Sequence, residues 1–337
     1  MYVFFIHAFD VLGEKIEGES PGVFDEEPVD EYANTLIGDL FKDNKLAPVP
    51  NAILSFNVWM YVVHQLYDIL RACKRGNENT DSDMKKGLDI AAALWIGADQ
   101  EGNDIDTGNM LFNLAGQAAA HFSQVSNGQA AANDKFIESL NAIKAAINIG
   151  QCQQADQEGA YIGLRIIIRR LIGYMTIPLV QLLIHHVMER ATSQTSDFIE
   201  MYALSIGPRV EACMPSSFLD MVDLFVREDF NVSEQDDAIT LIQSVYSCLE
   251  IDCQMIGEYA SGQIKACDDS VSSANFTFAG YEIESDTPDA RSGARNVRFT
   301  KLIVSIIHHI SPVDILTYFV VSSRRQESTE TFCKYVF

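Results

Sequence analysis

Hydrophobic residues recur every three or four positions along most of the chain, which is the spacing of amphipathic helices. From Asn51 to Arg75 the pattern is continuous, with Asn51 suited to cap the helix and Gly76 suited to end it. The same spacing predicts helices over residues 83–96, 109–122, 134–149, 164–174, 179–191, 197–210, 216–228, 234–249, 302–310 and 313–322. Alternation typical of a strand occurs over 276–283. We predict a mostly α fold, a multi-helix globular bundle with a minor β or irregular C-terminal segment, pinned by disulfides.

Composition divides the chain into regions. Residues 1–50 are rich in glycine, proline and acidic side chains and predict an extended acidic N-terminal arm. We expect an N-terminal helical region over 51–150, a C-terminal helical region over 160–267, and an irregular segment with closing helices over 268–337. The polar stretch Gln151–Gly159 is the best candidate for a boundary, although everything from residue 51 onward also fits one continuous domain.

Two long apolar runs resemble membrane spans by length but carry too much polarity. Tyr161–Val187 contains three arginines and two histidines, and Leu302–Val321 is interrupted by two histidines, a proline and an aspartate. A span needs about 20 residues with almost no charge, so both runs predict buried core helices. Pro178 and Pro208 predict breaks in the helices that hold them, because proline lacks a backbone N–H. The apolar start, Met1–Phe9, lacks the basic region of a complete signal peptide.

The charge balance limits the partners. The chain has 47 acidic against 24 basic residues, a formal net charge of −23. Such a surface repels nucleic-acid phosphates and anionic lipids and attracts cations. Hydrophobic residues make up 47% of the chain, enough for a core, so the sequence describes a folded protein. We therefore expect no nucleic-acid partner and no membrane span.

The cysteines indicate disulfides. Four of the seven fall within a short stretch, at Cys213, Cys248, Cys253 and Cys267, which allows three connectivities. Cys73 and Cys152 are candidates for another bridge, which leaves Cys333 over. Buried free thiols and metal thiolates are the alternative interpretations, and the Cys248–Cys253 spacing has no matching second pair for zinc.

Two Asn-x-Ser/Thr acceptors, at Asn231 and Asn275, lie near these cysteines. Disulfides persist in oxidising surroundings, and glycosylation acceptors are used on the surface loops of secreted chains. Together they predict a secreted, periplasmic or cell-surface glycoprotein.

Two histidine–carboxylate pairs are candidate metal ligands. His64 and Asp68, and likewise His185 and Glu189, are four residues apart and share a helix face. An imidazole and a carboxylate on one face can supply two ligands to iron or zinc. The alternative is a histidine that caps or hydrogen-bonds its own helix.

An acidic loop is the candidate site for a hard cation. Its carboxylates are Asp99, Glu101, Asp104 and Asp106, and with Asn103 they place oxygen ligands at nearly alternate positions. The loop lacks the glycine and the final glutamate of an EF-hand. Its alternative is a solvated turn whose acids favour the start of the next helix.

Catalytic motifs for hydrolases, zinc proteases and nucleotide binding do not occur in the sequence, so we expect a protein that is not an enzyme. Arg165 and Arg169 share a face of a very apolar helix, and burial there predicts salt bridges to acids, or a bound anion.

Several segments resemble a known family. They are Ala92–Gly97 and Gly108–Ala115 with His121-Phe122, then Leu171–Ile184, then Tyr202–Cys213 with Tyr246–Cys253 and Gly257. These segments are similar to the algal iron-assimilation proteins, also described as high-CO2-inducible or low-iron-inducible periplasmic proteins, and especially to their diatom-type relatives. The similarity covers roughly residues 52–260, and residues 267–337 have no counterpart in the family.

The resemblance implies a secreted, non-enzymatic helical protein that captures iron, and it carries over no iron ligands. We therefore expect a protein that binds iron or another cation without catalysis. The alternative is a structural or assembly subunit of a cell-surface or extracellular structure, which associates with itself through the N-terminal arm.

Overall fold

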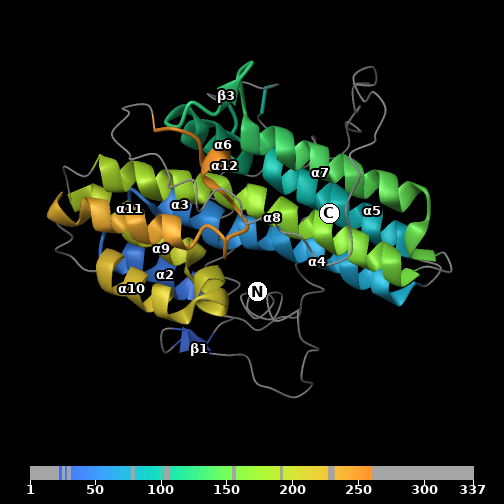
Figure 1. Cartoon of the computed structure of the whole chain (residues 1–337), viewed down its shortest axis with the longest axis horizontal. Helices are drawn as coiled ribbons and strands as arrows, with labels where there is room; N and C mark the ends of the chain where they lie inside the picture. Colours follow the sequence, from blue (N-terminus) through green and yellow to red (C-terminus); the bar gives the residue numbers. More distant parts are fainter. Residues whose placement is uncertain are drawn as a thin grey trace. The chain divides into compact units, whose positions relative to one another are not determined.

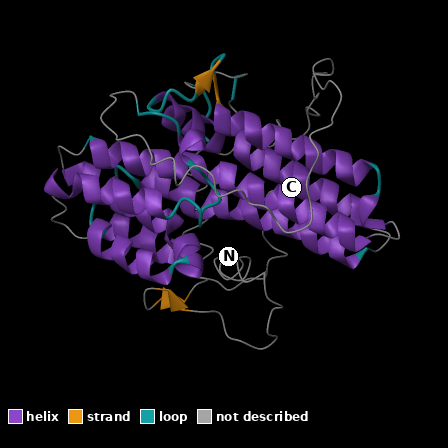
Figure 2. Cartoon of the chain, in the orientation of Figure 1, coloured by secondary structure: helices purple, strands orange, loops and turns teal. Residues whose placement is uncertain are grey.

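The computed structural model of the chain describes residues 23–24, 27–28, 32–76, 80–98, 100–101, 107–153, 157–189, 193–226 and 232–259. Most of this backbone is helical, with two short hairpins (Figures 1 and 2). The prediction of a mostly α fold with disulfides is therefore confirmed. The strand expected over 276–283 and the closing helices over 302–322 lie outside the described residues.

The larger helices lie close to their expected positions. The helices are α2 (Tyr32–Lys42), α3 (Val49–Ala52), α4 (Trp59–Arg75), α5 (Thr80–Ile96), α6 (Leu111–Ala120), α7 (Ala131–Asn148), α8 (Gln157–Met188), α9 (Ser193–Cys213), α10 (Pro215–Phe225), α11 (Gln235–Ser244) and α12 (Cys253–Ile256). A π-helical segment, Ile53–Val58, joins α3 to α4, and 3-10 turns occupy Gln151–Gln153 and Val232–Glu234. The hairpins pair β1 (Val23–Phe24) with β2 (Glu27–Pro28) and β3 (Val125–Ser126) with β4 (Gln129–Ala130), both antiparallel.

Helix α8 is the central element of the bundle (Figure 1). It packs against α4, α6, α7, α9, α11 and α12. In the described part of the chain, Glu158–Met188 is the one helix with the length and composition of a membrane span, and 72% of its most apolar window is buried within the protein. Burial against six neighbours accounts for its apolar character, as expected for a core helix.

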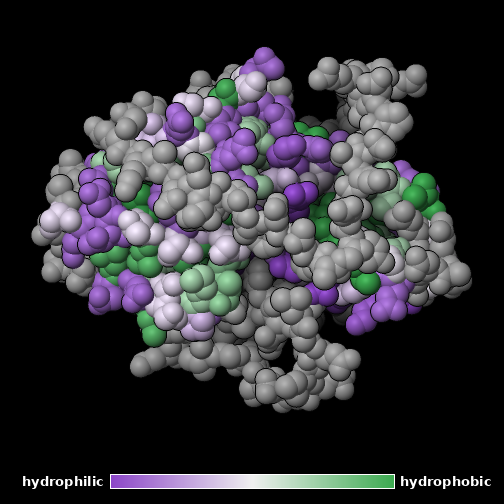
Figure 3. Space-filling model, viewed as in Figure 1, coloured by the Kyte–Doolittle hydropathy of each residue, from purple (hydrophilic) through white to green (hydrophobic). Residues whose placement is uncertain are grey.

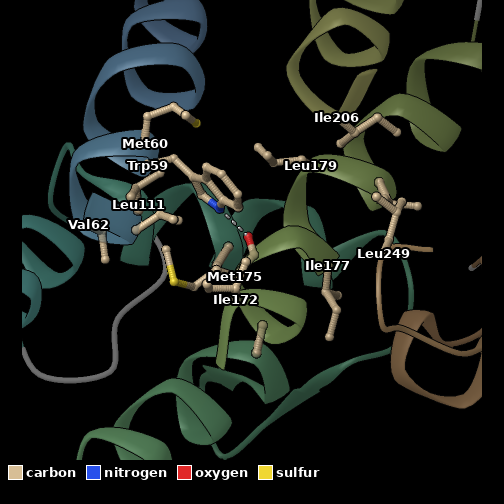
Figure 4. Close-up of a cluster of buried hydrophobic side chains, with 14 of the residues drawn as sticks. Trp59, Met60, Val62, Leu111, Ile172, Met175, Ile177, Leu179, Ile206 and Leu249 are labelled. Carbon is tan, nitrogen blue, oxygen red and sulfur yellow. Dashed lines mark hydrogen bonds between the residues drawn. The ribbon is translucent and has the colours of Figure 1, made fainter. Parts of the chain in front are cut away.

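Helix α8 runs through Pro178 without a break, which corrects the prediction of two separate helices. A proline leaves the carbonyl four residues earlier without its helical donor and loosens the turn around it. Here the indole N–H of Trp59 donates to the carbonyl oxygen of Met175 at 2.9 Å, inside that turn (Figure 4). Trp59 is 1% exposed and packs among apolar side chains of α6, α8 and α9. A tertiary donor and dense packing therefore hold the helix together where its own hydrogen bonding is weakest.

Helix α9 likewise continues through Pro208. The next residue, Arg209, is fully buried and reaches across to α8, where its guanidinium donates to Thr176 Oγ1 and to the carbonyl oxygen of Ile172. It also donates to the carbonyl oxygen of Leu249 at 3.0 Å. These contacts fasten α9 to α8 beside the proline, so tertiary bonds again overrule the local break.

Helical structure begins earlier in the chain than expected. Residues 32–42 form α2, whose Ala33, Ile37 and Leu40 are buried at helical spacing against the core. The expectation of an extended arm up to residue 50 is therefore wrong from residue 32 onward, because the acidic composition concealed that spacing. Asn51 is not an N-cap either: it lies inside α3, and its side-chain amide donates to the Tyr202 hydroxyl at 2.9 Å.

The polar stretch Gln151–Gly159 is not a domain boundary. The chain forms two units, Met1–Ser273 and Ala274–Phe337, and the stretch lies inside the first. Helices α7 and α8 pack against each other on either side of it. The second unit lies outside the described residues. On the face of the first unit in Figure 3, hydrophilic and hydrophobic residues of the described part are interspersed.

Two disulfides have both of their cysteines among the described residues. One joins Cys73 to Cys152, as the sequence suggested, and the other joins Cys213 to Cys248, which selects among the three connectivities left open. Cys253 is disulfide-bonded as well. Cys267 and Cys333 lie outside the described residues, as do the glycosylation acceptors Asn231 and Asn275. Such disulfides are typical of proteins in an oxidising compartment.

Candidate functional site

Polar side chains from three parts of the chain meet at the C-terminal end of α8. His185 and His186 lie in the last turn of α8, His121 directly follows α6, and Tyr259 follows α12. Gly257 allows the last two segments to meet, because it has φ +86° and a Cβ there would lie 2.6 Å from the Phe122 carbonyl oxygen. Any other residue at this position would push Tyr259 away from the cluster.

His185 is the centre of this cluster and is 7% exposed. Its Nδ1 lies 3.0 Å from the Tyr259 hydroxyl, and its Nε2 lies 3.3 Å from Glu189 Oε2. Its ring stacks on that of His121, with centroids 3.6 Å apart and an interplanar angle of 17°. A carboxylate only accepts, so Nε2–H donates to Glu189 and Nδ1 accepts from the Tyr259 O–H. Both nitrogens are therefore satisfied in the neutral ring.

The electrostatics agree with a neutral His185. Burial lowers its pKa, the neighbouring His121 lowers it further, and Glu189 opposes both. The pKa of Tyr259 is raised by burial and by the charge of Glu189, so its hydroxyl keeps its proton at neutral pH. The side chain of Glu189, which contacts His185 Nε2, is 62% exposed.

His186 occupies a separate aromatic stack on the α9 side. Its ring lies on Phe198, with centroids 4.5 Å apart, and 5.7 Å from Tyr202. Burial, followed by the nearby His185 and His121, lowers the pKa of His186 to about 4. His186 is therefore an uncharged packing residue, whereas His185 faces polar groups.

Gln181, one turn before His185 on the same face of α8, holds the adjoining segment. Its amide N–H donates to the Ile256 carbonyl oxygen at 2.8 Å, and the residue is 1% exposed. This bond fixes the end of α12 against α8 and sets the approach of Tyr259.

The second predicted pair, His64 and Asp68, is also in contact, with Nε2 and Oδ2 3.2 Å apart. Asp68 is shared with Arg71, whose guanidinium donates to its Oδ1. A cation at Asp68 would have to compete with this arginine. Burial lowers the pKa of His64, and Asp68 only partly offsets that effect. This pair is therefore the poorer site for a metal.

The acidic loop cannot be assembled from the described residues. Asp99, Asp104 and Asp106 lie outside them, and Glu101 is exposed. Within the described ranges, no three His, Cys, Asp or Glu side chains form a ready-made metal cluster. The predicted ligands therefore come together as two separate pairs and not as one centre.

Of the two predicted arginines, Arg169 forms a salt bridge with Glu250, with its Nε 2.7 Å from the carboxylate. The expectation of a structural ion pair is confirmed for this residue. The fully buried Arg209 was not among the predicted site residues, and neither were His121 and Tyr259. No local period connects positions 121, 185 and 259, so only their location in the fold brings them together.

Comparisons of the chain with protein-family models, with curated proteins and with solved structures gave no match. The functional argument therefore depends on the side chains themselves.

His185 and Glu189 offer an imidazole nitrogen and a carboxylate oxygen, the ligand types that iron and zinc accept in proteins. His185 Nε2 and Glu189 Oε2 lie 3.3 Å apart, so both face the same point in space. With a cation at Nε2, the proton would move to Nδ1 and donate to Tyr259, the outer hydrogen bond that typically orients a ligating histidine.

Proposed function

We propose that this protein binds a cation, iron foremost, without turnover, and that it is secreted, periplasmic or held at the cell surface. The observation that carries the proposal is the His185–Glu189 pair, with one donor buried and the other exposed at the mouth of the cluster. The ring of His121 stacks on that of His185 and places a further imidazole beside the pair. Imidazole and carboxylate together suit iron and zinc.

The arrangement supports capture rather than chemistry. Two protein ligands leave most positions of a cation open to water or to small carboxylates, so the cation can arrive and leave as a complex. The net charge of −23 raises the concentration of cations near the surface. The disulfides are typical of an oxidising compartment, and the resemblance to algal iron-assimilation proteins points to the same function.

Metal uptake by the full chain tests the proposal. The metal-free protein would be dialysed to equilibrium against ferric citrate, ferrous ion or Zn²⁺ at pH 7.5, and the bound metal measured. We expect uptake of about one cation per chain, and at least a tenfold weaker affinity in Glu189→Gln. Glu189 is 62% exposed, so this variant should fold normally.

The matched control is Asp68→Asn, which changes the other pair in the same way and should alter the affinity less than twofold. An absence of uptake for all three cations would reject cation binding. Uptake that Glu189→Gln leaves unchanged would reject this site and leave the function standing.

A second proposal, a structural subunit that associates with itself, has one observation in its favour. Phe41 and Leu46, at the end of α2 and just after it, are 41% and 54% exposed and follow the N-terminal segment. Light scattering coupled to size exclusion tests it: assembly by the parent chain that Phe41→Ser/Leu46→Ser abolishes would support it. A monomer at all concentrations would reject it.

A further inference from the structure

The segment Val245–Tyr259, here named the strap, lies over α8 and the end of α9 (Figure 1, orange). Polar contacts hold it along α8: Arg169 binds Glu250, Gln181 donates to the Ile256 carbonyl, and His185 contacts Tyr259. The strap is therefore the element that brings Tyr259 to the histidine cluster.

The strap contains one residue in an uncommon backbone conformation. Glu250 has φ +58°, a left-handed conformation that costs a residue with a side chain free energy. Its carbonyl oxygen would lie 2.7 Å from a Cβ at Gly173, so the strap touches the α8 backbone there. Such a conformation persists only where its surroundings enforce it.

A disulfide lies two residues before Glu250. Cys248, in the strap, is bonded to Cys213, the last residue of α9. Cys248 is 7% exposed, whereas Cys213 is exposed to solvent. The other described disulfide is different, since Cys73 and Cys152 are 0% and 2% exposed. The strap disulfide therefore has one residue open to solvent, whereas both residues of the other are buried.

We propose that Cys213–Cys248 is a site of thiol–disulfide exchange, and that its reduction unlatches the strap from α8. A thiolate of a dithiol reductant attacks the exposed Cys213 sulfur, and the S–S bond breaks with Cys248 as the leaving thiolate, which takes up a proton. The second thiol of the reductant then displaces Cys213. The products are two protein thiols and the oxidised, disulfide form of the reductant.

Unlatching follows from chain entropy. The bond closes a loop with a sequence separation of 35. Breaking the bond gives the opened state back the conformational entropy that the closed loop had removed. The buried Tyr246, Leu249 and Ile256 and the disulfide of Cys253 still hold the strap, so reduction of Cys213–Cys248 makes opening more frequent instead of permanent. From the usual worth of a disulfide, opening should become on the order of a hundredfold more frequent.

The first test measures which disulfide reacts. The native full chain would be treated with increasing dithiothreitol, its thiols trapped by alkylation and mapped by mass spectrometry. We expect Cys213 and Cys248 to be alkylated at least ten times faster than Cys73 and Cys152. Equal rates, or a faster buried pair, would overturn the proposal.

The second test measures strap opening by amide hydrogen exchange. We expect peptides from the strap to exchange about a hundredfold faster after selective reduction and in Cys213→Ser/Cys248→Ser, with α5 and α7 unchanged. Cys73→Ala/Cys152→Ala is the matched control. In this variant the strap amides should still exchange slowly relative to those of the rest of the chain. Unchanged protection of the strap amides would refute unlatching. The reduced parent chain provides this test even if the variant fails to fold.

If the proposed function holds, reduction should also weaken cation binding, because a strap that opens more often keeps Tyr259 against His185 for less of the time. The two tests above need no cation, so they succeed or fail separately from metal uptake.

Discussion

His186 and His185 are neighbours in sequence, yet their surroundings give them different roles. His186 is stacked against α9 aromatics and stays uncharged, while His185 has a polar partner on each ring nitrogen. Neither role follows from the residue type, because imidazole serves as a packing group or as a ligand with equal ease.

The lowered pKa of His186 predicts how stability depends on pH. Unfolded, the ring has a pKa near 6.5, and in the folded protein it is about 4. Its contribution to stability is therefore complete above pH 6.5 and is lost as pH falls from 6.5 to 4, because the unfolded chain binds the proton more tightly. His186→Phe keeps the stack and removes the titration.

We expect the parent to lose on the order of 3 kcal/mol more than His186→Phe between pH 7 and pH 4. Urea unfolding at pH 7, 5.5 and 4 measures this difference. Identical pH profiles would show that His186 accepts a proton in the folded state as easily as in the unfolded one.

At the scale of elements, α8 and α9 both pass a proline that should end them. The Trp59 indole N–H donates to a carbonyl oxygen of α8 near Pro178. The guanidinium of Arg209, the residue after Pro208, donates to another carbonyl oxygen of α8. Helix boundaries read from proline alone were therefore wrong here, whereas Gly76 ends α4 as expected, with φ +57°. A left-handed C-cap depends on the residue at that position and can be predicted from it. A hydrogen-bond donor from a distant part of the chain cannot be predicted in this way.

Two glycines of α8 allow a paired test of the strap contact. A Cβ at Gly173 would lie 2.7 Å from the Glu250 carbonyl oxygen, while one at Gly163 meets nothing within 4 Å. We expect Gly173→Ala to lower the free energy of unfolding by about 1–3 kcal/mol through overpacking. Gly163→Ala should raise it by about 0.5–1 kcal/mol through helix propensity.

Calorimetric or urea unfolding of both variants measures these changes, and their opposite signs are the critical result. Stabilisation by both substitutions would mean that the strap does not lie against α8 at Gly173.

At the scale of the whole molecule, the Cys73–Cys152 bond fastens the end of α4 to the turn before α8, across a sequence separation of 79. In the loop-entropy account, so long a loop gives a large stabilisation. We expect Cys73→Ala/Cys152→Ala to lose about 2–5 kcal/mol of unfolding free energy, measured in urea without reductant. A loss below about 1 kcal/mol would show that the buried contacts alone hold this end of the bundle.

The sequence by itself determined the elements that depend on near neighbours. Helical periodicity located α4 to α11 closely, because residues three and four apart share a face wherever that face is buried. The same spacing brought His185 and Glu189 together, and cysteine content indicated an oxidising compartment.

Tertiary structure decided what depends on residues far apart in the chain. His121 meets His185 and Tyr259, Arg209 reaches Leu249, and Cys213 takes Cys248 as its partner, all across more than thirty positions. Such contacts leave no period in the sequence. They form because burial of the apolar faces of α8 and its neighbours fixes where each polar side chain comes to lie.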